Sequence, residues 1–291
     1  MNGIEKSNRR VEMSAVLPDA VYEYEKAYTS GQKDPTLKAD DVLKEAGINT
    51  KSYEIVDSMY DKDSGVAAIA VKDKLTEETY ISYAGTNYKA DGHKDIIVDA
   101  AIGINDSLYL KKKNKPALDF YDRVEAKGNY ITTTTGHSYG EFQAGRVALE
   151  RQVPYNYGYQ GAPQSVNGKT AQQMIKDGDS KLFNEILVNK DFDHFKTMVE
   201  VKTNQTGLSM PSDKVLKQYW TYFSSLKNIS PETLKSSEKE AKRIEELRKN
   251  CKGQSITFSS TRDVLTNLVW NQNKLEIQFE GQALDGAFLQ W

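Results

Sequence analysis

One serine in this sequence is set for covalent chemistry by its neighbours. Ser138 lies in Gly136-His137-Ser138-Tyr139-Gly140, directly after the β-branched run Asn129–Thr135. A strand that ends in G-x-S-x-G and leads into a helix is the setting of a nucleophile elbow. There the turn holds the serine in strained dihedrals with Oγ exposed, and small residues on either side avoid clashes. The alternative interpretation is a glycine-rich turn between a strand and a helix, with no chemical role.

A serine that attacks a carbonyl needs donors for the oxyanion that forms, and two backbone N–H groups commonly supply them. One donor belongs to the residue after the nucleophile, here Tyr139. The second belongs on the loop after an earlier strand. The segment Thr79–Asn87, a strand pattern that ends in Gly85-Thr86-Asn87, offers this loop. We therefore expect the N–H groups of Thr86 and Tyr139 to form the oxyanion hole.

The acid of a serine triad is expected just after a later strand. The alternating run Gln254–Ser259, a short polar turn and then Asp263 fit this position. The alternative is a surface aspartate that caps the helix pattern Val264–Val269. Four rival acids lie in helical or turn contexts further upstream: Asp177, Asp179, Asp191 and Asp193.

The general base is harder to assign, because the sequence has three histidines, His93, His137 and His194, and all precede Asp263. Three explanations stay open. The sequence is a piece of a longer chain that continues to a histidine, the base has been lost or replaced near Gln282-Ala283, or His194 folds over the site. Position alone predicts a structural role for His137 and an exposed loop position for His93.

Four segments in order resemble class 3 lipases and their bacterial phospholipase-like relatives: Tyr83-Ala84-Gly85-Thr86, Asp95-Ile96-Ile97-Val98-Asp99, Thr135–Gly140 and Gly161-Ala162-Pro163. The resemblance covers about residues 53–165 and returns near 252–280. The family commonly has arginine where Ala84 stands. The resemblance implies an α/β-hydrolase fold, lipid acyl esters as substrates, and Ser138 and Asp263 as catalytic residues. Some relatives act as exported antibacterial toxins, which an inhibitor (immunity) protein or a secretion partner would bind.

The elements that would position these residues can be read from hydrophobic periodicity. Residues 17–47 are predicted to be helical, with a stop at Gly47. The strand patterns Tyr53–Met59, Val66–Val71 and Thr79–Tyr83 predict an antiparallel meander. Around Ser138, a strand, the helix Tyr139–Gln152 and the strand Pro154–Gln160 predict a parallel βαβ unit. Further patterns are helical at 94–104, 116–127, 170–177, 181–188, 213–226 and 231–249, and strand-like at 255–259 and 274–279.

These patterns predict one α/β-hydrolase domain over 1–291, with a mostly parallel central sheet. Residues 165–250 read as a helical insertion, interpreted as a lid or cap, or alternatively as an ordinary second helical layer. A net charge of −2 gives no global field for nucleic acid. One cysteine and scattered histidines predict no metal site, and no phosphate-binding loop or other cofactor motif is present. Lys111-Lys112-Lys113 reads as a solvated loop, with attraction to lipid headgroups as the alternative.

No window of the sequence is apolar enough to span a bilayer, and Met1–Met13 is too charged for a cleaved signal peptide. We therefore expect either export without a cleaved signal or a cytoplasmic location. The functional hypothesis is a serine carboxyl-ester hydrolase of the lipase or phospholipase A type. The alternative hypothesis is a catalytically incomplete lipase-like domain that binds a lipid or a protein partner.

Overall fold

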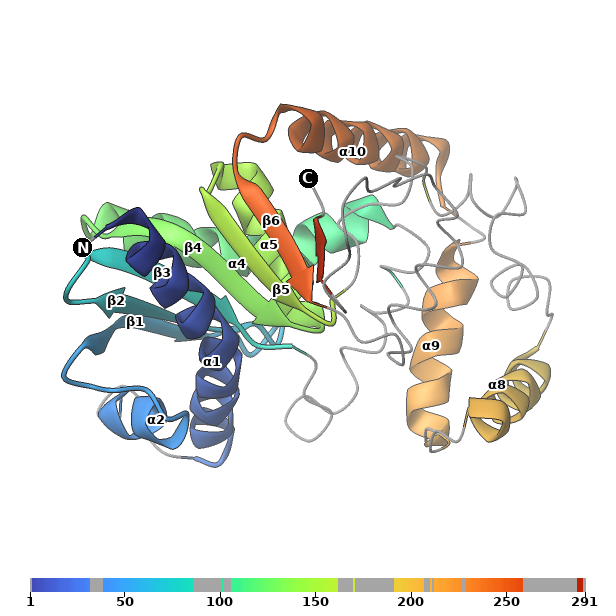
Figure 1. The fold of residues 1–291 in the computed structure, drawn as a ribbon. Coiled ribbons are helices and arrows are strands. Elements are labelled where there is room, and N and C mark those ends of the chain that lie inside the picture. Colours follow the sequence, from blue (N-terminus) through green and yellow to red (C-terminus); the bar gives the residue numbers. More distant parts are fainter. Residues whose placement is uncertain are drawn as a thin grey trace. The chain divides into compact units, whose positions relative to one another are not determined.

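The chain falls into two compact units in a computed structural model. The first unit comprises Met1–Asp95, Lys111–Gln164 and Glu246–Trp291, and the second comprises Ile96–Leu110 and Ser165–Glu245. Figure 1 shows the elements of both. The structure describes residues 2–31, 39–85, 101, 106–161, 170, 191–206, 210, 212–226, 229–258 and 287–289.

A seven-stranded sheet in the order β1-β2-β3-β4-β5-β6-β7 forms the centre of the first unit. The strands are β1 Tyr53–Tyr60, β2 Ala67–Asp73, β3 Glu78–Tyr83, β4 Tyr130–His137, β5 Tyr155–Tyr159, β6 Gln254–Phe258 and β7 Ala287–Leu289. The first three form the predicted antiparallel meander. Strands β3 to β6 pair in parallel, and β7 closes the edge in the antiparallel sense. The α/β class with a mostly parallel central sheet is confirmed.

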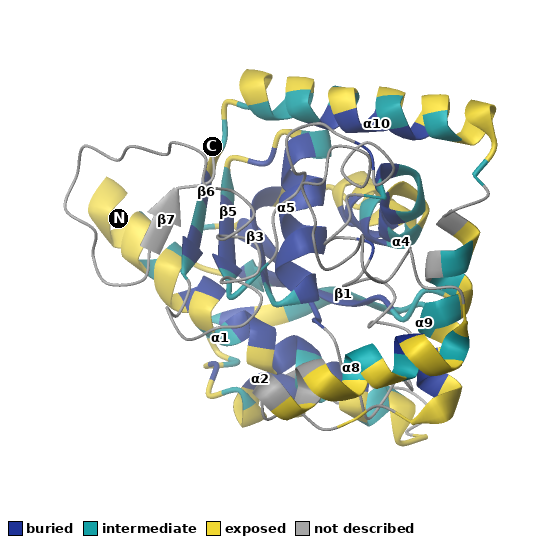
Figure 2. Cartoon of the chain, turned by 90° about the vertical axis from the view of Figure 1, so that its right-hand side faces the viewer, coloured by how far each residue is buried: buried dark blue, intermediate teal, exposed yellow. Residues whose placement is uncertain are grey.

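Helices cover both faces of this sheet. Each face has its own hydrophobic core, and alternate residues of β2 belong to different cores, because successive side chains of a strand point to opposite faces. Ile69 and Val71 pack with α1 (Gly3–Thr29) and α2 (Ala39–Glu45). Ala68 and Ala70 pack with α4 (Ser107–Ala126) and α5 (Tyr139–Arg151). Figure 2 shows that α5 is buried along almost its whole length, so the helix that follows Ser138 is held from all sides.

The prediction of one helical region over 17–47 is wrong in two respects, because the helix begins earlier and the region contains two helices. Helix α1 begins at Gly3, and α2 is a separate helix. A capping box starts α1: the Glu5 N–H donates to Asn2 Oδ1 (2.9 Å) and the Asn2 N–H donates to Glu5 Oε2 (2.9 Å). The predicted stop at Gly47 is confirmed, since Gly47 has φ +76° after the end of α2.

Two predictions near α4 are also wrong. The helix begins at Ser107 rather than at Pro116, and Pro116 lies within it. Proline is common at the first helical position, and inside a helix it removes one N–H donor and clashes with the preceding turn, so the sequence favoured a helix that starts at Pro116. Lys111-Lys112-Lys113 therefore lies on α4 and not in a loop.

The second unit is helical in its described part. It contains α8 (Phe192–Thr206), α9 (Asp213–Leu226) and most of α10 (Pro231–Asn250). The last two helices were predicted, with the Ser230 hydroxyl accepting from the Thr233 N–H (3.1 Å) as the N-cap. Within this unit the Tyr222 hydroxyl donates to Asp106 (3.1 Å), and the Trp220 ring packs on Phe195. No helix in the described segments is long and apolar enough to cross a bilayer.

Several predicted elements fall on residues outside the described ones. These are almost all of the helix 94–104, the helices 170–177 and 181–188 apart from Thr170, and the strand 274–279. The short strand β7 was not predicted, and neither was α8 as an element.

Candidate active site

Ser138 connects β4 to α5 in a backbone conformation that serine rarely adopts. Its φ is 56° and its ψ is −125°. A non-glycine residue with positive φ is uncommon, and such strain costs of order 1–3 kcal/mol. Serine at a helix N-cap usually accepts a hydrogen bond from the first turn, yet the Ser138 side chain makes no capping bond. Ser138 is partly exposed, and its hydroxyl is not used to cap the helix that follows.

Two glycines of the motif let the backbone turn this tightly. A Cβ on Gly136 would lie 2.2 Å from the carbonyl carbon of Gly140, and a Cβ on Gly140 would lie 2.2 Å from the Tyr83 carbonyl oxygen. The second contact brings the start of α5 against the end of β3. These short distances leave no room for a side chain at Gly136 or Gly140, as expected for an elbow. The strand and the helix predicted around Ser138 are both present.

The end of β3 and the start of α5 supply the two sides of a candidate oxyanion hole. Tyr139 is the first residue of α5, at the positive end of the helix dipole. Gly140 packs against Ala84 and Gly85, the residues that lead into Thr86. Thr86 itself lies outside the described residues. Ala84, where the lipase family commonly has arginine, is buried in the core beneath α1.

A chain of hydrogen bonds joins α1, the elbow and the end of β5. The Gly85 N–H donates to Tyr22 Oη (3.1 Å), which lies 3.1 Å from His137 Nδ1. His137 Nε2 lies 3.0 Å from Gln160 Oε1. An amide oxygen only accepts, so Nε2 donates to Gln160, and the Tyr22 hydroxyl accepts from the Gly85 N–H. The His137 ring is thus held on both sides, by a residue of α1 and by the residue after β5.

A buried carboxylate lies under the first turn of α5. Glu141, three residues after Ser138, is only 1% exposed and accepts a hydrogen bond from the Thr257 hydroxyl of β6. A Cβ on Gly158 would lie 2.0 Å from the Glu141 carboxyl, so the glycine leaves the space that the carboxyl fills. The carboxylate thus joins α5 to β5 and β6 at the edge where the candidate acid loop begins.

The chain has limited similarity to known proteins. No family model matches the sequence, and no curated protein does. Among solved structures, lipase II from Rhizopus niveus is similar with 16% sequence identity and a TM-score of 0.35. The similarity covers 55% of this chain and 63% of the lipase chain. The chain therefore matches less than two thirds of that lipase.

The remaining residues predicted for the site are placed as follows. Asp263, His93 and the rival acids Asp177 and Asp179 lie outside the described residues. His194 is exposed on α8 of the second unit, where its backbone N–H donates to the Asp191 carboxylate (2.8 Å). Asp193 is exposed in the first turn of the same helix. Among the described side chains, no group of three or more His, Cys, Asp or Glu is arranged to hold a metal ion.

Two residues of the hydrogen-bond chain, Tyr22 and Gln160, were not predicted as site residues. Tyr22 read only as an apolar position of a helix, and Gln160 as the end of a strand. No local pattern marks either of them, because both reach His137 through contacts between elements distant in the sequence. Gln160 also has a positive φ of 53°, but a backbone dihedral angle cannot be recognised from the sequence.

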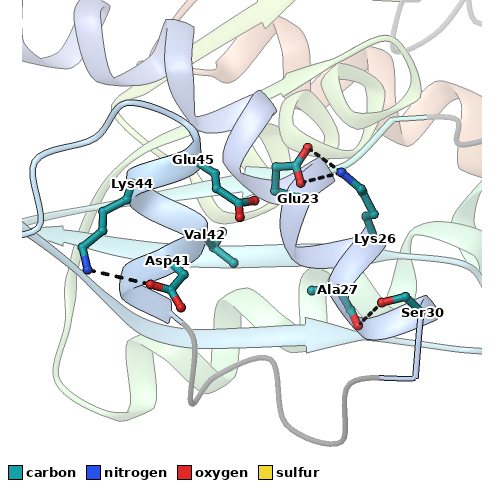
Figure 3. A pocket seen from close by; sticks show the side chains of 8 residues that line it. All are labelled: Glu23, Lys26, Ala27, Ser30, Asp41, Val42, Lys44 and Glu45. Atoms are coloured by element: carbon teal, nitrogen blue, oxygen red, sulfur yellow. Dashed lines mark hydrogen bonds and ion pairs between the residues drawn. The ribbon is translucent and has the colours of Figure 1, made fainter.

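A surface hollow of about 310 Å³ lies elsewhere in the first unit, between the end of α1 and α2 (Figure 3). Each wall has an ion pair within its own helix, Lys26 with Glu23 (3.1 Å) on α1 and Lys44 with Asp41 (3.8 Å) on α2. No candidate site residue lines it.

Proposed function

We propose that this protein is a serine hydrolase that cleaves acyl esters through Ser138. The observation that carries the proposal is the strained backbone of Ser138, at φ 56° and ψ −125°, with its hydroxyl withheld from helix capping. Strain of this kind persists only where the surrounding packing enforces it, and it gathers at functional sites. Here the enforcing contacts come from Gly140 and the end of β3.

The reaction follows from what surrounds the serine. Ser138 Oγ attacks the ester carbonyl carbon and an acyl-enzyme forms as the alcohol leaves. The oxyanion lies at the N-terminus of α5, where the Tyr139 N–H and the helix dipole stabilise it. Thr86 is proposed as the second donor. The Gly85 N–H already donates to Tyr22, which leaves this role to the residue after it. Asp263 is proposed as the acid of the site.

The substrate class proposed is a lipid acyl ester of the glycerolipid or glycerophospholipid type. Its support is the order and spacing of the four lipase-like segments, from Tyr83-Ala84-Gly85-Thr86 to Gly161-Ala162-Pro163. If the proposal holds, turnover of a long-chain glycerophospholipid exceeds that of a short-chain nitrophenyl ester at equal concentration. A preference for the short ester would reject the lipid assignment and leave the serine chemistry intact.

The nucleophile is tested by labelling the purified protein with a fluorophosphonate. We expect one label per chain, located at Ser138 by peptide mass spectrometry, and no label in Ser138→Ala. Ser107→Ala is the matched control, since Ser107 also lies at the start of a helix, as the first residue of α4. Equal labelling of wild type and Ser138→Ala would rule out Ser138 as the nucleophile.

A further inference from the structure

Helix α1 contributes one side chain, Tyr22, to the hydrogen bonds around the elbow. The Gly85 N–H donates to Tyr22 Oη (3.1 Å), and the same oxygen lies 3.1 Å from His137 Nδ1. Whichever atom of the Tyr22–His137 pair donates, the two side chains stay in contact. The Tyr22 hydroxyl is therefore held from two sides, by a ring of the elbow and by a backbone N–H.

Gly85, two residues after the end of β3, packs directly on the elbow. A Cβ on Gly85 would lie 2.3 Å from the His137 carbonyl oxygen and 3.2 Å from Ser138 Cβ. A Cβ on Gly140, in the first turn of α5, would lie 2.9 Å from the Gly85 nitrogen. The Gly85 backbone thus lies against Ser138 and against the start of α5, so a displacement of Gly85 changes the surroundings of both.

Helix α1 is anchored to the two strands that flank the elbow. Pro18 lies inside α1 and has no N–H, so it cannot donate to the Ser14 carbonyl one turn earlier. That carbonyl instead accepts from Thr135 Oγ1 of β4 (3.0 Å). The Ser14 hydroxyl lies 3.0 Å from the Tyr159 hydroxyl of β5. The helix that carries the tyrosine is therefore fixed relative to the strands that position the elbow.

We propose that Tyr22 is a positioning residue of the hydrolytic site, which fixes the backbone beside Ser138 by holding the Gly85 N–H. The inference rests on the proposed function of Ser138. Backbone donors stabilise an oxyanion when they are aimed at the place where its charge develops, and a misplacement of about 1 Å can cost about 10²-fold in rate. Without the Tyr22 hydroxyl, the Gly85 N–H loses its acceptor, and the backbone that leads to Thr86 is no longer held against the elbow.

Tyr22→Phe tests this role, since it keeps the ring and removes only the hydroxyl. We expect the maximal rate of fluorophosphonate labelling at Ser138 to fall about 10–100-fold, with no change in the concentration that gives half of this rate. The affinity for a long-chain trifluoromethyl ketone, whose adduct with a serine carries an oxyanion, should fall by the same factor. An ether analogue of the substrate, which has no carbonyl to attack, should bind as it does to the wild type.

Tyr24→Phe is the matched control, because Tyr24 is also a buried tyrosine of α1, but its ring packs on Tyr28. We expect this variant to match the wild type in all three measurements. Replacing the Gly85 amide by an ester removes the N–H, which is the other half of the same hydrogen bond. Its effect on ketone affinity should therefore not add to that of Tyr22→Phe.

Equal losses of ketone and ether binding in Tyr22→Phe would overturn the proposal, since the hydroxyl would then support only the binding pocket. Wild-type ketone affinity in this variant would also overturn it, and so would additive effects of Tyr22→Phe and the Gly85 ester. Absence of label at Ser138 in the wild type would instead reject the proposed function itself.

Discussion

At the scale of single residues, the elbow depends on the absence of a side chain at Gly140. In Gly140→Ala the new methyl would lie 2.2 Å from the Tyr83 carbonyl oxygen and 2.8 Å from the carbonyl carbon of Ala84. Both are backbone atoms, so α5 must move away from β3. Alanine gains about 1 kcal/mol in helix propensity over glycine, but overpacking on this scale costs more. We expect a net loss of about 2 kcal/mol or more in the free energy of unfolding, measured by urea titration.

Gly3→Ala is the control for that substitution. Gly3 is also helical, at the start of α1, and a Cβ there would meet no atom within 4 Å. We expect no loss of stability and a gain of up to about 1 kcal/mol. If Gly140→Ala proved as stable as Gly3→Ala, the close approach of α5 to β3 would be wrong.

The buried carboxylate of Glu141 gives a second prediction at this scale. In Gly158→Ala the new Cβ would lie 2.0 Å from the Glu141 carboxyl, so the carboxyl must leave its place near Thr257. Glu141→Ala removes the carboxyl and leaves space. Each single variant should be destabilised, and the double variant should recover part of the loss, with a coupling energy of about 0.5–3 kcal/mol. Strictly additive losses in a thermal or urea double-mutant cycle would contradict the packing of Glu141 on Gly158.

At the scale of elements, α1 is attached to the sheet by ion pairs at the turn between β2 and β3. Arg9 donates to the Asp73 carboxylate (2.8 Å), and the Asp73 side chain is fully buried. Burial opposes ionisation of Asp73, but hydrogen bonds from Arg9 and from the Leu75 N–H (2.9 Å) outweigh it and lower its pKa. A carboxyl with a lowered folded-state pKa stabilises the fold above its unfolded pKa of about 3.9, and this stability is lost as the pH falls through the folded value.

Asp73→Asn should therefore reduce the free energy of unfolding by about 1.5–3 kcal/mol at pH 7, the range for hydrogen bonds to charged groups. The difference from wild type should shrink below about pH 4, where the Asp73 carboxyl of the unfolded chain takes up a proton, and should be lost as the pH falls through the lowered pKa of the folded state. Asp119→Asn is the control, because Asp119 pairs with Lys115 on the exposed side of α4 and should change stability by less than about 0.5 kcal/mol. A pH-independent effect of Asp73→Asn would show that the charge of Asp73 is not what stabilises α1.

The elements that the sequence predicted well are those with a strong local period. The meander, β4, α5 and β5 around Ser138, α9 and α10 were all predicted. The start of α1 was missed although Asn2 and Glu5 have capping-box spacing, since the first turns are charged and their arginines bind the distant residues Asp73 and Glu78. The setting of Ser138 could be predicted from its glycines, whereas its role stays a prediction. The Tyr22–His137–Gln160 chain could not be predicted, because it depends on how three distant segments meet.

At the scale of the whole molecule, contacts between distant segments define the units. Residues 96–110 belong with 165–245 in the second unit, where Tyr109 packs on Tyr222 and Asp106 accepts from the Tyr222 hydroxyl. The aromatic residues Trp220 and Tyr222 thus pack within this unit. Sequence periodicity found α9, but it could not reveal that a segment so far upstream packs on it.

The balance of charge over the whole chain leads to a last prediction, which rests on the proposed phospholipid hydrolysis and concerns the charge of the lipid surface. Lys and Arg total 39 against 41 Asp and Glu, so the net charge of −2 gives no attraction to anionic membranes. Lys111 and Lys112 are adjacent exposed lysines on α4, so we take them as the pair to test for contact with an anionic membrane. A lysine that docks on an anionic surface contributes about 1 kcal/mol, so a docking pair would strengthen vesicle binding about 30-fold.

We expect instead that phospholipid hydrolysis is the same on zwitterionic and anionic vesicles, is insensitive to salt, and is unchanged in the Lys111→Gln, Lys112→Gln double variant. A 30-fold preference for anionic vesicles that this double variant abolishes would identify α4 as a membrane-docking surface. It would contradict the prediction that charge does not contribute to membrane binding.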